Sequence, residues 1–324
     1  MPHADADACV AAALRICPDL PFWPTRPLAV GDEQMIRQWA LGLPGVGDAP
    51  GEDKGGGGVA WVGRDRAPGQ PALAHSAAGT LQPLLRALRQ RPGPPGWLKL
   101  QATGPVTLAV ALDAGGRAAI SIPSARGPLA LGYAARLRSV VTRVREALPA
   151  WKLLVVLDEP SLTHPLVAAE PKLAVELWQS ARSTGADVTG LHCCATPPWG
   201  LLLDLDPQLV SFDAVTHGDD ATDDPAFRRL IASGTAVAWG LIPSAPEVGS
   251  DAEAEALKAD PEALAARLLD LVGWTAGDYR PEVLARSLVT PTCGLAALDE
   301  PEADRRLTLA AATGRVAWEQ AGLP

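Results

Sequence analysis

The 324-residue chain is poor in the residues that would assign it to several common classes of protein. It has five cysteines and no apolar stretch long enough to cross a bilayer. Five cysteines, an odd number in a long chain, do not make a disulfide scaffold. The N-terminus also lacks the basic region and apolar core of a secretory signal. We therefore expect a cytoplasmic protein without a membrane partner, in which the thiols serve packing, redox chemistry or metal binding.

Positive charge is also scarce. Lys and Arg total 28 against 37 Asp and Glu, which gives a net charge of −9. No basic stripe is available to displace the counterions of a phosphate backbone, so we expect no nucleic-acid partner. The acidic residues are scattered along the chain, as is typical of a solvated surface.

Apolar runs rich in Val, Leu and Ile alternate with longer helical patterns almost from end to end. Fully apolar strands separated by helices are typical of a parallel sheet with both faces covered. Because the alternation is continuous, it favours one barrel over two doubly wound halves. The sequence thus predicts an α/β fold, a single (β/α)8 TIM-barrel domain over residues 1–324. The expected strands are 59–63, 97–102, 152–157, 186–193, 208–213, 235–241 and 286–291, and the expected helices are 79–90, 127–148, 170–184, 224–233, 251–272 and 301–318.

One segment departs from this alternation. Residues 44–57 (PGVGDAPGEDKGGG) have the composition of a loop, and glycines fill positions 55–58. The run lacks the Lys-Ser/Thr of a P-loop and opens no helix. We therefore expect a flexible connection there and no phosphate cradle.

The stretch VTGLHCCATPPW at residues 188–199 concentrates reactive side chains at the end of an expected strand. Side chains at i and i+2 of a strand share a face, so His192 and Cys194 point together and Cys193 points to the other side. In a barrel, strand ends of this kind form the mouth where active sites lie. Cys193 is expected to pack as a small buried apolar residue. Taken alone, His-x-Cys is more often core packing than a metal site, and a redox pair is the third alternative.

A second strand end favours the metal interpretation. The segment LVTPTCGL places Cys293 directly after another apolar strand, with Gly294 allowing a tight turn. One His and two Cys provide three soft ligands, the number that a catalytic zinc site uses while one position stays open. We therefore expect Zn2+ as the cofactor. Cys9 and Cys17 lie in a helical pattern without metal-ligand spacing and are expected to pack.

Three other strand ends carry candidate substrate-binding residues. In VVLDEPSL, Asp158 and Glu159 place charges where they are costly unless they meet solvent or a ligand. Helix capping by one of the two is the alternative. In QATGPVT, Gly104 allows close backbone approach before a helix N-terminus that favours anionic groups. In LVSFDAV, Asp213 ends the next strand.

These segments, in this order, resemble a known family. The segments QATGPVT, LDEPSL, LHCCATPPW, VSFDAV, AWGLIPS and VTPTCGL are similar to the catalytic barrel of the cobalamin-independent methionine synthases. That superfamily also holds uroporphyrinogen decarboxylase and the zinc-dependent methylcobamide:thiol methyltransferases. The resemblance is to its short single-barrel bacterial members and covers most of the chain.

The resemblance implies a zinc-dependent S-methyltransferase that methylates a thiol. The first candidate for this thiol is homocysteine, which would give methionine. It implies His192, Cys194 and Cys293 as the zinc ligands and Asp158 as the carboxylate that holds the amino group of homocysteine. Asp213 stands where full-length members have a fourth, glutamate ligand, and either replaces it or only lines the mouth. Zinc would hold the thiol as a thiolate that attacks a methyl group.

Two features depart from the family pattern. Members begin with a strand that ends in Gly-Ser-x-Pro-His, whereas this chain starts MPHADADAC. The first barrel strand is therefore expected to be missing or truncated, which a misassigned start codon would explain. The family's acidic substrate-binding residue after the second strand has no counterpart, because FWPTRP stands there.

The methyl donor and acceptor have alternatives. The chain has no room for the second barrel that helps full-length members bind folate, so the resemblance to short members implies methylcobalamin or a corrinoid protein as donor, with methyl-folate as the alternative. Another thiol, as in the coenzyme M methyltransferases, is the alternative acceptor. A non-catalytic paralogue with structural zinc is a further hypothesis. Uroporphyrinogen decarboxylase is disfavoured because its arginine-rich site is not seen near the strand ends.

Overall fold

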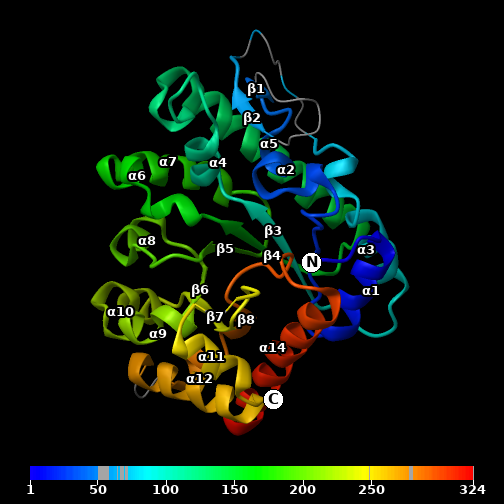
Figure 1. The fold of residues 1–324 in the computed structure, drawn as a ribbon, viewed down its shortest axis with the longest axis vertical. Helices are drawn as coiled ribbons and strands as arrows, with labels where there is room; N and C mark the ends of the chain where they lie inside the picture. Colours follow the sequence, from blue (N-terminus) through cyan, green and yellow to red (C-terminus); the bar gives the residue numbers. More distant parts are fainter. Residues whose placement is uncertain are drawn as a thin grey trace. The chain divides into compact units, whose positions relative to one another are not determined.

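The computed structural model describes residues 1–49, 58–63, 65, 69, 72–247, 249–276 and 280–323. Their contacts divide the chain into two compact units, whose elements are labelled in Figure 1. The first unit consists of His3–Leu14 and Pro18–Thr189, and the second of Met1–Pro2, Arg15–Cys17 and Gly190–Pro324. The glycines at positions 55–57 lie outside the described residues.

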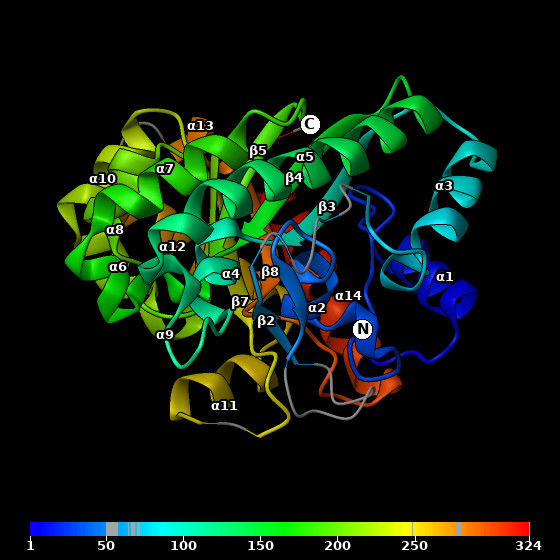
Figure 2. The ribbon, with the colours of Figure 1, turned by 90° about the horizontal axis from the view of Figure 1, so that it is seen from above.

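Two long parallel strands form the centre of the first unit. β3 (Trp97–Thr103) pairs with β4 (Lys152–Asp158), in a register that runs from Trp97 opposite Lys152 to Thr103 opposite Asp158. The chain crosses between them through α4 (Pro105–Ala111) and the long α5 (Pro123–Ala147), which packs against α7 (Pro171–Arg182; Figure 2). The five central residues of β4, 153–157, are all buried, as expected for a strand covered on both faces.

Shorter elements complete the first unit. They are α1 (Ala6–Ile16), which continues into the second unit, η1 (Gly31–Glu33), α2 (Met35–Ala40), η2 (Ser76–Ala78), α3 (Leu81–Gln90), η3 (Ala119–Ser121), η4 (Pro160–Thr163) and α6 (Pro165–Ala169). A buried ion pair holds the N-terminal part together: the guanidinium of Arg26 donates to Glu33 at 2.7 Å, and the same carboxylate accepts from the Arg26 backbone N–H.

The prediction of a buried parallel strand at 59–63 is wrong. β2 (Val59–Trp61) is a three-residue strand paired antiparallel with β1 (Val46–Asp48). The place beside β3 is taken by Phe22, which forms an isolated parallel bridge with Lys99. Pro21 and Pro24 flank this bridge, and because proline has no N–H to donate, the pairing cannot extend into a longer strand.

The second unit is built on four consecutive parallel strands. β5 (Val188–Cys193) pairs with β6 (Leu209–Asp213), β6 with β7 (Ala236–Ile242), and β7 with β8 (Ser287–Pro291). The helices that follow the strands are α8 (Trp199–Leu205), α9 (Ala214–Asp223), α10 (Pro225–Ala232), α11 (Asp251–Lys258), α12 (Pro261–Ala276), α13 (Arg280–Leu284) and α14 (Glu300–Gln320). A cluster of edge-to-face and tilted rings, Trp199, Phe212, Phe227 and Trp239, packs on one side of β6 and β7.

The predicted alternation is confirmed as an α/β fold with parallel strands, but a complete (β/α)8 barrel is wrong for the described residues. They contain six parallel strands, β3 to β8, which fit part of a TIM-barrel-like fold. The expected helix 251–272 is divided into α11 and α12, because Pro261 begins a new helix. Among the helices of the described ranges, none is long and apolar enough to cross a membrane.

Candidate metal centre

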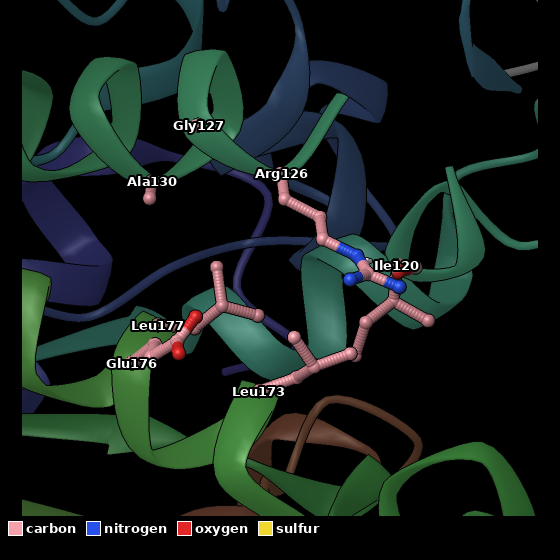
Figure 3. Close-up of a pocket in the computed structure, with 7 residues that line it drawn as sticks. All are labelled: Ile120, Arg126, Gly127, Ala130, Leu173, Glu176 and Leu177. Carbon is pink, nitrogen blue, oxygen red and sulfur yellow. Dashed lines mark hydrogen bonds between the residues drawn. The ribbon is translucent and has the colours of Figure 1, made fainter. Parts of the chain in front are cut away.

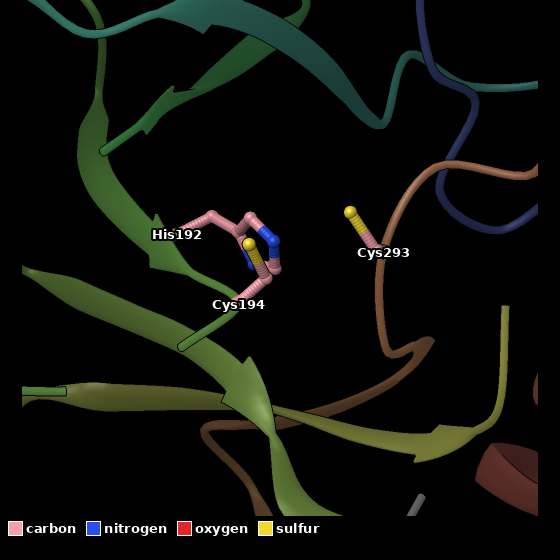
Figure 4. A group of neighbouring side chains, drawn as sticks. All are labelled: His192, Cys194 and Cys293. Atoms are coloured by element: carbon pink, nitrogen blue, oxygen red, sulfur yellow. The ribbon is translucent and has the colours of Figure 1, made fainter. Parts of the chain in front are cut away.

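The end of β5 carries the first two predicted ligands. His192 lies within the strand and Cys194 directly follows its last residue. Figure 4 shows their side chains on the same side of the strand end, as the i, i+2 spacing predicts. Cys193, between them, is fully buried, as expected for a packing residue.

The third predicted ligand follows a different strand, β8. Cys293 lies in the loop after β8, and its Sγ points towards the other two side chains (Figure 4). The ligand atoms of His192, Cys194 and Cys293 all lie within 4.8 Å of one another. In the part of the chain that the structure describes, this is the one group of three or more His, Cys, Asp or Glu residues that could hold a metal ion.

The donor atoms fit a zinc ion. Imidazole nitrogen and thiolate sulfur are the donors that zinc prefers, and bonds of 2.0–2.3 Å in a tetrahedron place ligand atoms about 3.5–3.8 Å apart. Since no two ligand atoms are more than 4.8 Å apart, the group has to close by at most about 1 Å around an ion of this geometry. Three protein donors would leave a fourth position for a water or a substrate, the arrangement of catalytic zinc sites.

The two thiols influence each other. A hydrogen bond with Cys194 raises the pKa of Cys293 to about 12, and loss of hydration adds to the effect, while His192 acts in the opposite direction. The residue as a whole is exposed, and its Sγ faces the other two side chains (Figure 4). Without a metal the Cys293 side chain is therefore a neutral thiol near pH 7, so a metal has to displace a proton when it binds.

The imidazole of His192 has a hydrogen-bond partner on the next strand. Ser211 is its register partner on β6, and the Ser211 hydroxyl lies 3.0 Å from His192 Nδ1. Both residues are buried. Because Nδ1 is engaged in this hydrogen bond, Nε2 is the ring nitrogen left for a metal.

Two buried hydroxyls anchor the loop that carries Cys293. Thr292 Oγ1 accepts from the backbone N–H of Ser244 at 3.1 Å and lies 3.0 Å from the Ser244 hydroxyl. Gly240 allows the approach, because a Cβ there would lie 2.6 Å from the carbonyl oxygen of Phe212 and 3.0 Å from Thr292 Cα. The loops after β7 and β8 are thereby tied together beside the candidate ligand.

The loop after β7 is fixed in turn by α14. The buried guanidinium of Arg306 donates from Nη1 to the carbonyls of Pro243 and Ala245, at 2.8 and 2.7 Å. Its Nε donates to Glu302 at 2.6 Å. Arg305 and Arg306 together lower the pKa of Glu302 to about 2, so this carboxylate stays ionised and holds Arg306 in place.

Asp213 caps a helix of the second unit. Its Oδ1 accepts from the backbone N–H groups of Val215 and Thr216, both at 3.0 Å, and caps the N-terminus of α9. The group of three ligand atoms described above does not include it.

Asp158, in the first unit, accepts the last hydrogen bond in a chain of polar side chains that starts at Lys99 and that the sequence analysis did not identify. Its Oδ1 accepts from Gln101 Nε2 at 2.7 Å, and Gln101 accepts in turn from Lys99 Nζ. Lys99, Gln101 and Thr103 alternate with apolar residues along β3. This period of two in LKLQAT was a readable signal that one face of the strand is polar.

Glu159 and Gly104 form one packing arrangement. The carboxylate of Glu159 is fully buried and accepts from the backbone N–H groups of Val106 at 2.9 Å and Thr107 at 2.7 Å, at the start of α4. Burial raises the pKa of Glu159 to about 7 against the opposing effect of these hydrogen bonds. A Cβ on Gly104 would lie 2.1 Å from Glu159 Cδ, so only glycine fits beside it. The capping role considered for the Asp-Glu pair therefore belongs to Glu159.

A small hollow lies between α5 and α7 in the first unit (Figure 3). Its volume is about 110 Å³, and most of its lining is apolar. The Nε of Arg126 donates to the Ile120 carbonyl at 2.7 Å at its edge. None of the candidate site residues is among those that line it: Ile120, Arg126, Gly127, Ala130, Leu173, Glu176 and Leu177.

No family model matches the chain, and no curated protein matches it by sequence. Solved structures that are similar to it in fold include a methyltransferase and a methionine synthase. A methyltransferase from Methanosarcina mazei matches with a TM-score of 0.60 at 13% identity, over 98% of this chain and 87% of that chain. A B12-independent methionine synthase from Shewanella sp. W3-18-1, in complex with selenomethionine, matches with a TM-score of 0.50 at 14% identity, over 73% of this chain.

The match spans 65% of the length of that methionine synthase. At these identities the similarity shows a shared fold and does not assign the chain to a family.

Proposed function

We propose that this chain is a zinc-dependent methyltransferase that transfers a methyl group to a thiol, with homocysteine as acceptor and methionine as product. The observation that carries the proposal is the convergence of His192, Cys194 and Cys293 from two strand ends within 4.8 Å. Similarity in fold to a methionine synthase and to a methyltransferase supports the same reaction class.

The chain's own residues would hold the metal and leave it accessible. Zinc, when bound, would supply a Lewis acid that keeps the acceptor thiol deprotonated near neutral pH. His192 and Cys194 would bind from the rigid end of β5, and Cys293 from the loop that Thr292 and Ser244 anchor. The exposure of Cys293 would let a thiol substrate reach the open position.

For the substrate, we assign Asp158 to the amino group of the acceptor. Its side chain is half-buried, and the amide of Gln101 donates to its Oδ1, which orients the carboxylate. Glu159 and Gly104 would contribute by shaping this strand end. Asp213 would line the site or, after releasing α9, serve as a fourth ligand.

The proposed donor is methylcobalamin or a corrinoid protein, with methyl-folate as the alternative. The test incubates zinc-loaded protein with homocysteine and either methylcobalamin or methyltetrahydrofolate, and measures methionine by mass spectrometry. Methionine from the wild type, and none from a Cys293→Ala variant with an unchanged circular dichroism spectrum, supports the proposal. The Cys17→Ala variant is a matched control, because this thiol lies outside the ligand group and its loss is expected to leave activity intact.

Other outcomes overturn the proposal in distinguishable ways. Methylation of coenzyme M, with none of homocysteine, would show that the acceptor is a different thiol and that the reaction class is correct. Bound zinc without methyl transfer to any thiol, together with unfolding when zinc is removed, would indicate a structural zinc site in a non-catalytic protein.

A further inference from the structure

We propose that Ser211 is a positioning residue, which fixes the ring of His192 so that Nε2 is the nitrogen presented to the metal. This inference rests on the metal site of the proposed function, and it does not depend on the methyl donor or acceptor. Its basis is a contact between two neighbouring strands within the second unit.

The contact follows from the strand register. His192 and Ser211 are paired residues of the parallel strands β5 and β6, and their side chains meet with Nδ1 and Oγ 3.0 Å apart. Only 8% of His192 and 7% of Ser211 are exposed, so water competes little for either group. Ser211 is also paired with Ala238 of β7, so strands on both sides fix its backbone.

The chemistry of imidazole makes this contact directional. A neutral imidazole has one N–H, and a metal bound at Nε2 requires that proton to be on Nδ1. Nδ1 then donates to Ser211 Oγ, which stabilises this tautomer and fixes the rotation of the ring about its side-chain bond. Without an acceptor at this position, the other tautomer and other ring rotations become accessible.

A hydroxyl suits this site in a way that a carboxylate would not. Cys194 and Cys293 would bring two negative charges to the metal as thiolates. A carboxylate behind His192 would add a third negative charge in a buried position, whereas a serine hydroxyl accepts the hydrogen bond without a net charge.

The variants Ser211→Ala and Ser211→Thr separate positioning from packing. The affinity for Zn2+ is measured by competition with a chromophoric chelator, and the ligand-field spectrum is recorded with Co2+ in place of zinc. The Ala variant is expected to bind zinc 10–100-fold more weakly with an altered Co2+ spectrum, and the Thr variant, which keeps the hydroxyl, to recover most of the affinity.

Ser287→Ala is the matched control. Ser287 is another buried hydroxyl of the same unit, bonded to Trp239 Nε1 at 3.1 Å, and it is not part of the ligand group. Its loss is expected to lower the unfolding temperature and leave the zinc affinity unchanged. An unchanged affinity and Co2+ spectrum in Ser211→Ala would overturn the inference, and so would a Thr variant no better than Ala.

A measurement on the wild type keeps the test independent of how the variants fold. Nitrogen-15 NMR of the zinc-loaded protein, with His192 assigned by its loss in His192→Ala, is expected to show a protonated Nδ1 and a metal-bound Nε2. Coordination through Nδ1 would overturn this inference and leave the proposed function standing. Absence of zinc binding by the wild type would overturn the inference and the proposed function together, whereas zinc binding without methyl transfer would contradict only the function.

Discussion

The hydroxyls of Thr292 and Ser244 lie 3.0 Å apart in a buried contact, and Thr292 is the residue directly before Cys293. This contact joins the loop after β8 to the loop after β7, which Arg306 holds by two carbonyl groups. The position of the third candidate ligand therefore depends on hydrogen bonds made by its neighbours.

Replacing Thr292 with Val keeps the side-chain shape and removes the hydroxyl. The Ser244 backbone N–H then loses its acceptor in a buried place, which costs about 1–3 kcal/mol. We expect lower stability in urea unfolding and weaker zinc binding. Thr308→Val is the control, since Thr308 is exposed and its hydroxyl donates to the Asp304 carbonyl within α14. Equal zinc affinity in both variants would refute this role for Thr292.

A methyl group at Gly104 is expected to destabilise the first unit. An added Cβ would overlap the buried carboxyl of Glu159, and overpacking of this kind costs about 1–3 kcal/mol. Gly127→Ala, in α5, is the control because nothing lies within 4 Å of its added Cβ, so helix propensity should make it neutral or stabilising. Equal unfolding free energies for the two variants would show that the Gly104–Glu159 contact is not tight.

Glu159 makes stability depend on pH. Burial raises its pKa in the folded state from the ordinary value of 4.5 to about 7, so the folded state holds the proton more tightly than the unfolded state. The stability that this provides is fully present below about pH 4.5 and is lost as the pH rises through about 7, a change on the order of 3 kcal/mol.

The Glu159→Gln variant cannot ionise and serves as the comparison. The free energy of unfolding, measured in urea between pH 4.5 and 8, should fall with pH more steeply in the wild type than in the variant. The same pH dependence in both proteins would contradict this role for Glu159.

Zinc binding is expected to release protons. With the pKa of Cys293 near 12, this thiol carries its proton at neutral pH, and a metal must displace it. The zinc affinity should therefore rise with pH, and a pH indicator should record fewer protons released per zinc by Cys293→Ala than by the wild type. Proton release that is the same in both would mean that Cys293 is not a ligand.

Local patterns in the sequence predicted the strands of the second unit and the residues that meet at their ends. His192 and Cys194 share a side because strand side chains alternate, and parallel strand ends bring Cys293 to them. Ser211 could not be predicted in the same way, because its contact with His192 depends on the register between two strands.

The first unit was harder to predict. Phe22 pairs with β3 through a single bridge between prolines, which leaves no apolar run to recognise as a strand. The apolar segment at 59–61 looked like a barrel strand and instead pairs antiparallel with β1. For Asp158 and Glu159 the sequence left two alternatives open, a charge that meets solvent or a ligand and a helix cap. The Glu159 carboxylate is buried and caps a helix that precedes it in sequence by about fifty residues, a partner that no local pattern identifies.

X-ray absorption at the zinc edge of the loaded protein tests the central claim most directly. We expect two sulfur ligands and at least one nitrogen, from Cys194, Cys293 and His192, and a third sulfur when homocysteine is added. A zinc ion without sulfur ligands, or a sulfur count that homocysteine leaves unchanged, would contradict a catalytic thiol-binding zinc site.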